Sequence, residues 1–204
     1  LWSRGLGDVY KRQVHAFGPQ RVLASTTTHG AYRPEPGHVH WAGSGEMSIG
    51  PFMHPHDNES VAPLLKLLSD GGLNPQWQEN GRVMLWNKML LNIAINPIAG
   101  LLGKENGSLL EHHLFESSVS VMLEGARIAR AEGVPLQKDE QLVDRLRDVL
   151  VKTSNNYCSM LQDIRAGRET EINSLNLEIC RRGEILGLAT PLNQLLSSVI
   201  HDLR

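Results

Sequence analysis

The segment LWNKMLLNIAINP, residues 85–97, carries three polar side chains at every fourth position of an otherwise apolar run: Lys88, Asn92 and Asn96. Because a helix turns about 100° per residue, a step of four positions drifts by only about 40°. The three side chains therefore share one stripe of a helix whose other residues are largely Met, Leu, Ile and Ala. This polar stripe, as we call it below, lies on a helix that is otherwise suited to burial.

Lys88 is the residue of the polar stripe that could do chemistry. An amine in apolar surroundings is disfavoured as a cation, so we expect its pKa to fall toward the range that serves proton transfer. Such a lysine can donate a proton, form a Schiff base or bind an anion. The alternative interpretation is a lysine that reaches solvent from a helix end.

Asn92 and Asn96 favour a ligand site. Each amide brings two donor hydrogens and an acceptor oxygen that need partners when they are buried. Two amides in line with a lysine suit a small polar ligand with carbonyl, carboxylate and hydroxyl groups. The alternative is a hydrogen-bond network between helices, which the spacing alone leaves open.

A second concentration of polar residues lies in NNYCSMLQDIRAGRETEIN, residues 155–173. Its members with useful chemistry are Asn156, Ser159, Asp163, Arg168 and Glu171. Taken alone, Glu171 is most simply a solvated carboxylate on a helix surface. Two short segments add to the set, Asn106-Gly107 and HGAYR at 29–33. The latter follows a strand, where the ligand loops of α/β sheets lie.

The first third of the chain has the composition of strands and turns. RVLASTTT is a short β-branched run, and HVHWAGSGEMSIG alternates and is broken by glycines. Pro34, Pro36 and Gly37 supply the turn between them. SVAPLLKLLSDGG, residues 60–72, predicts a helix that ends at its two glycines, and LNPQWQEN predicts a short extended piece.

The rest of the chain is predicted to be helical, with the join near residue 82. The first helix is expected to be interrupted near Asn96-Pro97, and the last has Thr190 as N-cap and Pro191 at its first helical position. The predicted helices cover residues 83–102, 109–132, two stretches within 138–165, 169–186 and a last one from Thr190 onward.

Composition excludes several classes of protein. The 204 residues are 41% hydrophobic with a formal net charge of -2. Near-neutral charge argues against non-specific nucleic-acid binding, and no apolar run approaches the roughly 18 residues that cross a bilayer. Cys158 and Cys180 have neither ligand-like nor framework spacing, so we expect reduced thiols in a cytoplasmic protein.

Three histidine pairs raise the question of a metal site. His38 with His40, and His54 with His56, each have the H-x-H spacing, while His112-His113 are adjacent. Alternate positions of a strand place both rings of a pair on one face, where they can chelate. No carboxylate or cysteine completes the set at ligand spacing, so we expect no functional metal.

The first residues are unusual. Residue 1 is Leu, and DVYKRQ at 8–13 matches the translation of a transposon end used in sequencing libraries, with a charged loop as the alternative. We predict that residues 1–13 are a non-native scar.

Several segments together resemble the ketopantoate reductase (2-dehydropantoate 2-reductase) family. The strongest are W-x-K-x-x-x-N-x-x-x-N-P in the helix described above and SMLQDIRAGRETEI. TTTHGAYRPEPGHVHWAGSGEMSIG, GKENGSLL and GLATPLNQLL follow the family order and spacing. The resemblance runs from about residue 20 to the end of the chain.

The resemblance implies roles for individual residues. Lys88 matches the catalytic lysine that donates a proton to the ketone oxygen as hydride arrives from NADPH. Glu171 matches a catalytic glutamate that also lies beside the nicotinamide, and Ala31 matches a backbone contact to the cofactor. The residues that match substrate-binding positions are Lys88, Asn92, Asn96, Asn106 and Ser159.

The same resemblance implies the fold and the reaction. Residues 14–82 would be the C-terminal part of an NADP-binding Rossmann-type domain, an α/β remnant with a few strands and a helix. Residues 83–204 would be an all-α domain of the 6-phosphogluconate-dehydrogenase-like type. The expected reaction is the NADPH-dependent reduction of 2-dehydropantoate to (R)-pantoate in pantothenate biosynthesis, with a homodimer left open.

The sequence departs from the family in its first half. A dinucleotide fold needs a glycine-rich turn that brings the pyrophosphate to a helix N-terminus. GLG at 5–7 has Tyr10 where a third glycine would fall, and GSG at 43–45 lies between strands. We therefore expect an N-terminally truncated fragment that binds NADPH weakly and turns over poorly. The alternatives are a related 2-oxo acid reductase and a non-catalytic helical dimerisation or binding module.

Overall fold

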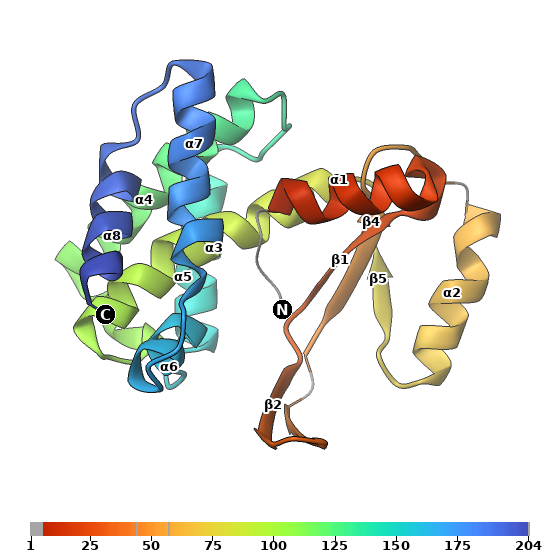
Figure 1. Ribbon diagram of the computed structural model, residues 1–204, viewed down its shortest axis with the longest axis horizontal. Helices are drawn as coiled ribbons and strands as arrows, with labels where there is room; N and C mark the ends of the chain where they lie inside the picture. The colour runs from red at the N-terminus through yellow and green to blue at the C-terminus, as the bar shows by residue number, and fades with distance from the viewer. Residues whose placement is uncertain (1–5, 44, 57, 204) are drawn as a thin grey trace. The chain divides into compact units, whose positions relative to one another are not determined.

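The computed structural model describes residues 6–43, 45–56 and 58–203 (Figure 1). The chain divides into two compact units, Gly7–Leu85 and a second that consists mainly of Trp86–Arg204. The division falls a few residues past the predicted join at residue 82. The first unit holds the strands and the second is helical, which agrees with the predicted order of an α/β portion before an all-α portion.

The first unit is built around a three-stranded sheet of order β1-β4-β5. β1 runs antiparallel to β4, with Leu23 opposite Pro51 and Thr27 opposite Met47. β5 runs parallel to β4. The strands of the sheet are β1 (Leu23–Thr27), β4 (Met47–Pro51) and β5 (Pro75–Trp77). The helices that belong with it are α1 (Leu6–Phe17), the short 3-10 helix η1 (Pro19–Arg21) and α2 (Asn58–Asp70).

Helix α1 contains DVYKRQ, residues 8–13, the segment predicted to be non-native. Its helical conformation does not decide where these residues come from, so the scar stays a prediction.

A separate two-stranded hairpin, β2 (Gly30–Glu35) and β3 (His38–Gly43), follows β1. The turn at Pro36-Gly37 was predicted, and Gly37 adopts φ +86°, a conformation that costs glycine little. The pairing shifts register between Gly30 and Ala31, so the hairpin is irregular where it leaves β1.

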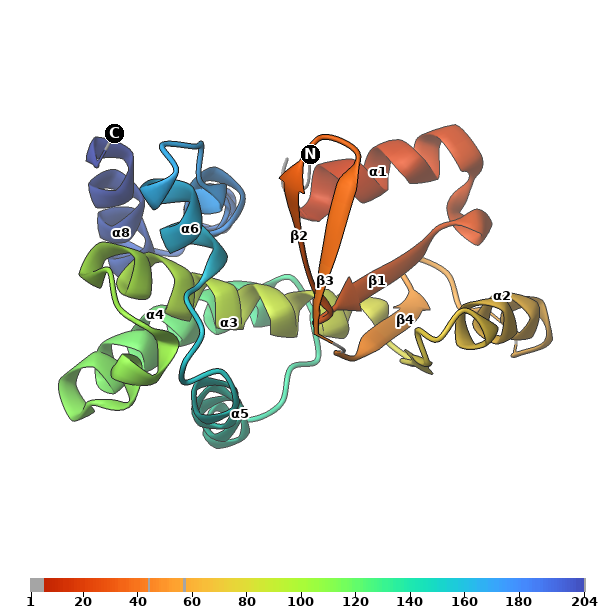
Figure 2. The ribbon, with the colours of Figure 1, turned by 90° about the horizontal axis from the view of Figure 1, so that it is seen from below.

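The helical unit packs around α3 (Gly81–Leu102) (Figures 1 and 2). Leu90 and Ile93 of α3 lie fully buried, and a Cβ at Gly125 of α4 would overlap both side chains. The absence of a side chain at Gly125 therefore allows α4 to approach α3 closely. The remaining elements of the unit are η2 (Asn106–Leu110), α4 (His112–Ala131), α5 (Asp139–Lys152), α6 (Ser159–Arg165), η3 (Glu171–Ser174), α7 (Asn176–Leu186) and α8 (Pro191–Asp202).

The predicted interruption of the first helix at Asn96-Pro97 is wrong, because α3 continues through Pro97 to Leu102. A proline has no N–H, so the carbonyl of Ile93, four residues earlier, loses its helical donor. The side-chain Nδ2 of Asn176 replaces that donor at 3.1 Å from the Ile93 oxygen. The freed carbonyl is thus satisfied by α7, and the helix need not break.

Two other helix predictions need correction. The predicted helix 169–186 is divided at Leu175 (φ -107°, ψ -99°) into η3 and α7, so Glu171 begins a 3-10 turn. Thr190 does occupy the N-cap position of α8 with Pro191 after it, but its side chain makes no capping bond. The Glu124 carboxylate of α4 accepts the N–H groups of Leu192 and Asn193 instead, at 3.0 and 3.1 Å.

Cys158 and Cys180 are both buried free thiols, as the sequence predicts. Among the described residues, no helix combines the length and the apolarity that a membrane span requires.

Candidate active site

Lys88 and Glu171 come together from α3 and η3, although 83 positions of sequence separate them. Burial lowers the pKa of the Lys88 amine, and the negative charge of Glu171 acts in the opposite direction with a smaller effect. As a whole residue Lys88 remains exposed to solvent, so this amine is partly desolvated and still within reach of a ligand. A lowered pKa makes the ammonium a stronger acid, as proton donation requires.

Glu171 is half-buried, and its pKa moves the other way. Burial raises the pKa of this carboxyl first, the negative charge of Asp163 raises it further, and Lys88 lowers it. Asp163 is held in place by Arg168, whose Nη2 lies 2.7 Å from the Asp163 carboxylate. Two groups whose pKa values approach each other can exchange a proton or hold one between them, which suits acid–base chemistry.

Asn92 and Asn96 continue the polar stripe of α3 and leave their amides free for a ligand. Asn96 is 7% exposed, and Asn92 is half-buried. In the described part of the chain, neither side-chain amide takes part in a hydrogen bond. The alternative of a helix–helix network therefore does not account for these two side chains, because among the described residues their amides hydrogen-bond to no neighbouring helix.

Asn106 begins η2 and is fixed by the segment that follows α5. Its backbone N–H donates to the Asn156 carbonyl at 2.9 Å, and its Nδ2 donates to Thr153 Oγ1 at 3.1 Å. Its Oδ1 is buried and has no hydrogen-bond partner among the described residues. A buried acceptor without a partner is uncommon and points to a ligand or an ordered water.

Ser159, the first residue of α6, is exposed and lies next to the Cys158 cap. The Cys158 sulfur accepts the N–H of Leu161 at 3.4 Å and donates to the Asn96 backbone carbonyl at 3.5 Å. Burial raises the pKa of the Cys158 thiol, which keeps it in the protonated form that can donate. Cys158 thus joins the start of α6 to α3 at Asn96, two elements that carry predicted substrate-binding residues.

Ala31 belongs to the other unit, on β2, opposite Trp41 of β3. It is exposed, and the register shift before it is of the kind that leaves backbone groups outside a strand ladder.

Sequence reasoning missed the buried amides that lie against α3. Asn176 and Asn193 are both fully buried, and Asn176 Nδ2 donates to Asn193 Oδ1 at 2.9 Å as well as to Ile93. Asn193 Nδ2 in turn donates to Glu124 Oε2 at 2.9 Å. One signal could have found this buried amide network, since a proline within an apolar helix predicts a freed carbonyl that needs a donor.

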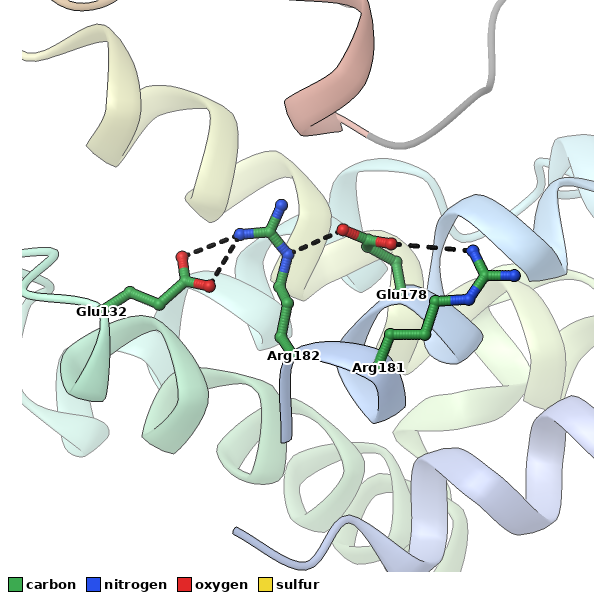
Figure 3. A network of polar contacts seen from close by, with 4 residues as sticks. All are labelled: Glu132, Glu178, Arg181 and Arg182. Carbon is green, nitrogen blue, oxygen red and sulfur yellow. Dashed lines mark hydrogen bonds and ion pairs between the residues drawn. The ribbon is translucent and has the colours of Figure 1, made fainter. Parts of the chain in front are cut away.

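Four charged residues of the helical unit form a network of ion pairs (Figure 3): Glu132, Glu178, Arg181 and Arg182. Arg182 Nη1 lies 2.8 Å from both carboxylate oxygens of Glu132, and its Nε lies 2.9 Å from Glu178. Arg181 makes a longer contact of 3.8 Å with Glu178. The Arg182 guanidinium also lies 5.4 Å from the ring centroid of Trp86, two residues before Lys88. The network therefore ties α7 to the end of α4 and to the part of α3 that carries Lys88.

The histidine pairs contact other groups. His38 Nδ1 lies 2.6 Å from Glu35, and both ring nitrogens of His56 contact backbone carbonyls at 2.9 Å. The rings of His112 and His113 stack with their centroids 5.2 Å apart. Within residues 6–43, 45–56 and 58–203, no group of three His, Cys, Asp or Glu side chains is placed to hold a metal ion.

Comparison with known proteins places these residues in context. A family model described as "Ketopantoate reductase PanE/ApbA C terminal" matches residues 80–204, and a second, "Ketopantoate reductase PanE/ApbA", matches residues 5–54. The 2-dehydropantoate 2-reductase of Halobacterium salinarum is 36% identical over 202 residues, covering 97% of this chain and 64% of the relative. That of Pyrococcus horikoshii is 36% identical over 182 residues, covering 88% of this chain and 59% of the relative. The chain thus spans somewhat less than two thirds of the length of these relatives.

A solved structure shows the same fold. The PanE/ApbA family ketopantoate reductase from Ralstonia eutropha JMP134 superposes with a TM-score of 0.80 at 29% identity, covering 94% of this chain and 62% of that one. This likeness confirms the predicted fold class, the end of a Rossmann-type domain followed by a helical domain.

Proposed function

The chain belongs to the ketopantoate reductase family, and from that premise we propose that it supplies the proton donor and substrate site of an NADPH-dependent 2-dehydropantoate 2-reductase. The product would be (R)-pantoate, an intermediate of pantothenate biosynthesis. We also propose that the protein is cytoplasmic, and either a monomer or a homodimer is compatible with this function.

The observation that carries the proposal is the pairing of Lys88 with Glu171, with the pKa of the amine lowered and that of the carboxyl raised. A surface ion pair would leave both groups near their ordinary values, because water screens exposed charges. Opposed shifts caused mainly by burial are typical of groups that do acid–base work.

These residues suit reduction of a ketone. Negative charge develops on the carbonyl oxygen as hydride adds to the carbon, and an ammonium aimed at that oxygen stabilises the transition state. Lys88 can then transfer a proton to the oxygen, and Glu171 favours the charged form of the lysine between cycles. The free amides of Asn92 and Asn96, together with Asn106 and Ser159, are proposed to bind the carboxylate and hydroxyl groups of the substrate.

A nicotinamide cofactor, when bound, would supply the hydride. Two residues of this chain are proposed to contact it, namely Ala31 through its backbone and Glu171 through its carboxylate. The exposed, irregular hairpin at Ala31 and the half-buried position of Glu171 fit such contacts. The sequence shows no glycine-rich pyrophosphate turn, so we assign this chain no further part in holding the cofactor.

The test has two steps. First, the DNA upstream of the Val14 codon is recovered, and the open reading frame found there is expressed with and without the preceding sequence. Second, 2-dehydropantoate-dependent loss of NADPH absorbance is measured for the wild type, Lys88→Ala and Glu171→Gln. Lys66→Ala is the matched control, because Lys66 is an exposed lysine of the other unit that pairs with Asp70.

We expect Lys88→Ala to lower kcat/KM by about 10²- to 10⁴-fold, the usual contribution of a general acid, and Lys66→Ala to leave it unchanged. Reduction of another 2-oxo acid but not 2-dehydropantoate would favour the related reductase. Full activity of Lys88→Ala and Glu171→Gln would leave the non-catalytic module as the better explanation.

A further inference from the structure

The hydroxyl group of Thr153 has only one hydrogen, and the chemistry of its two neighbours decides which of them receives it. Thr153 caps the C-terminus of α5, and its Oγ1 lies 2.7 Å from the Val149 backbone carbonyl. A carbonyl oxygen can only accept, so the Thr153 hydroxyl must be the donor in this short contact. Its oxygen is left with lone pairs for any other neighbour.

That neighbour is the side-chain amide of Asn106, 3.1 Å away. Because the Thr153 oxygen offers lone pairs, the amide must present its NH2 group to it. The reverse orientation would place two acceptor oxygens against each other. Thr153 therefore decides which way the Asn106 amide faces, and its carbonyl Oδ1 points to the opposite side.

Asn106 cannot move away from Thr153 to escape this constraint. Its backbone N–H donates to Asn156 at 2.9 Å, and the N–H of Gly107 donates to Ser154 at 2.9 Å. The two segments are also in close contact, because a Cβ at Gly107 would lie 2.9 Å from Ser154 atoms. The backbone of 106–107 is thus fixed against 153–156, and only the amide orientation remains to be set.

The Asn106 side-chain oxygen is therefore a hydrogen-bond acceptor held in one orientation. Asn106 is 8% exposed, and its Oδ1 is buried with no hydrogen-bond partner in the described part of the chain. A desolvated acceptor without a donor is unfavourable, and a ligand that brings an O–H or N–H donor removes that cost. An ionised carboxylate has no hydrogen to offer and would be repelled by this oxygen.

We propose that Thr153 is a positioning residue that orients Asn106 to recognise a hydrogen-bond donor, such as a hydroxyl group of the substrate. This inference rests on the proposed function, because it assigns Asn106 to the part of the 2-oxo acid that carries the hydroxyl rather than to its carboxylate. Thr153 itself touches no reacting atom. It sets a preference among 2-oxo acids through Asn106.

The first test needs no ligand and no activity. The side-chain amide hydrogens of Asn106 are followed by NMR hydrogen exchange in the wild type, Thr153→Val and Thr153→Ser. Valine keeps the shape of threonine but lacks the acceptor oxygen, whereas serine retains it. We expect exchange at least about tenfold faster in Thr153→Val and near-wild-type exchange in Thr153→Ser, because only the valine variant loses the bond. Equal exchange in all three proteins would overturn the assigned orientation.

The second test measures specificity in the intact reading frame. kcat/KM is determined for 2-dehydropantoate and for its analogue with hydrogen in place of the hydroxyl group. We expect the wild type to prefer the hydroxylated acid, and Thr153→Val to reduce that preference by about tenfold or more, with Thr153→Ser restoring it. A purely structural role would lower both values by the same factor and leave their ratio unchanged, which would refute the proposal.

The two tests separate this proposal from the function on which it rests. If the wild type reduces neither acid, the proposed function is wrong, and so is the proposed preference for the hydroxylated acid. The hydrogen-exchange data would still decide the orientation of the Asn106 amide. If the wild type reduces both acids equally well, the function stands and the role of Thr153 is wrong.

Discussion

The polar stripe of α3 and the buried amide network beneath it use the same side-chain chemistry in opposite ways. Asn176 donates to Ile93 and Asn193, and Asn193 donates onward to Glu124, so the donors of this network bond to groups of the protein. On the stripe, the amides of Asn92 and Asn96 make no such bonds among the described residues. Lys88 adds an amine whose pKa is lowered.

The difference indicates how to separate scaffold from site when both are rich in asparagine. A buried amide whose donors bond to protein carbonyls stabilises the fold, and its loss should reduce stability. An amide left without partners adds no bond to the fold, costs stability where it is buried, and is available to a ligand. If the comparison is right, substitutions on the stripe should mainly change activity, and substitutions in the network should mainly change stability.

The largest effect is expected from Lys88→Met, which keeps much of the side-chain volume and removes the charge. Activity of the intact reading frame should fall by about 10²- to 10⁴-fold, because the proposed proton donor is lost. The free energy of unfolding from urea titration should stay within about 0.5 kcal/mol of the wild type or rise, because the folded state no longer holds a partly desolvated ammonium. A large loss of stability would show that Lys88 belongs to the scaffold, which breaks the comparison.

The sequence revealed the polar stripe because a period of four residues is a local property. Lys88, Asn92 and Asn96 were placed on one stripe from the helical repeat, and the structure puts all three on α3. The strands, the hairpin turn and most helices were predicted for the same reason, since β-branched runs, glycines and apolar spacing act locally.

Two of the failures depend on residues far apart in sequence. Whether α3 breaks at Pro97 is decided by Asn176, which lies in another helix. The α8 cap comes from Glu124 rather than from the adjacent Thr190. Likewise, no local pattern shows that Glu171 lies near Lys88 or that Thr153 orients Asn106, because these relations exist only after the helices pack. The family resemblance predicted that Lys88 and Glu171 act together. The contact between Thr153 and Asn106 was found only in the structure.

The next largest effect tests the network. Asn176→Leu should lower the free energy of unfolding by about 2–4 kcal/mol, because the carbonyls of Ile93 and Asn193 would both lose a buried donor. Asn92→Leu is the matched control from the polar stripe and should change stability by less than about 0.5 kcal/mol, since its amide bonds to none of the described residues. Similar losses in the two variants, measured by urea unfolding, would erase the distinction between stripe and network.

A smaller effect is expected in the coupling between Asn176 and Pro97, measured as a difference in the free energy of unfolding. Pro97→Ala gives position 97 an N–H that can donate to the Ile93 carbonyl within α3. In that background, Asn176→Ala should cost about 1 kcal/mol less than it does in the wild type, because Ile93 keeps a donor. A double-mutant cycle measures this coupling, and purely additive free energies would mean that Asn176 does not stand in for the missing N–H.

The smallest effect is the pH dependence that Glu171 gives to stability. Burial raises the pKa of Glu171 in the folded protein above its ordinary value near 4.5. The folded state therefore binds this proton more tightly than the unfolded chain does. The stabilising contribution is fully present below pH 4.5 and is lost as the pH rises through the raised folded value. Glu171→Gln removes this titration.

Unfolding free energies of wild type and Glu171→Gln should consequently diverge as the pH increases from about 4 toward neutrality, with the glutamine variant gaining relative stability. Glu169→Gln, two residues away and exposed, removes one carboxylate from the same segment and controls for the change in net charge. If the Glu171→Gln and wild-type curves ran parallel, the Glu171 carboxylate would be an ordinary solvated group. Glu171 would then have to be removed from the site, and Lys88 would lose its proposed partner.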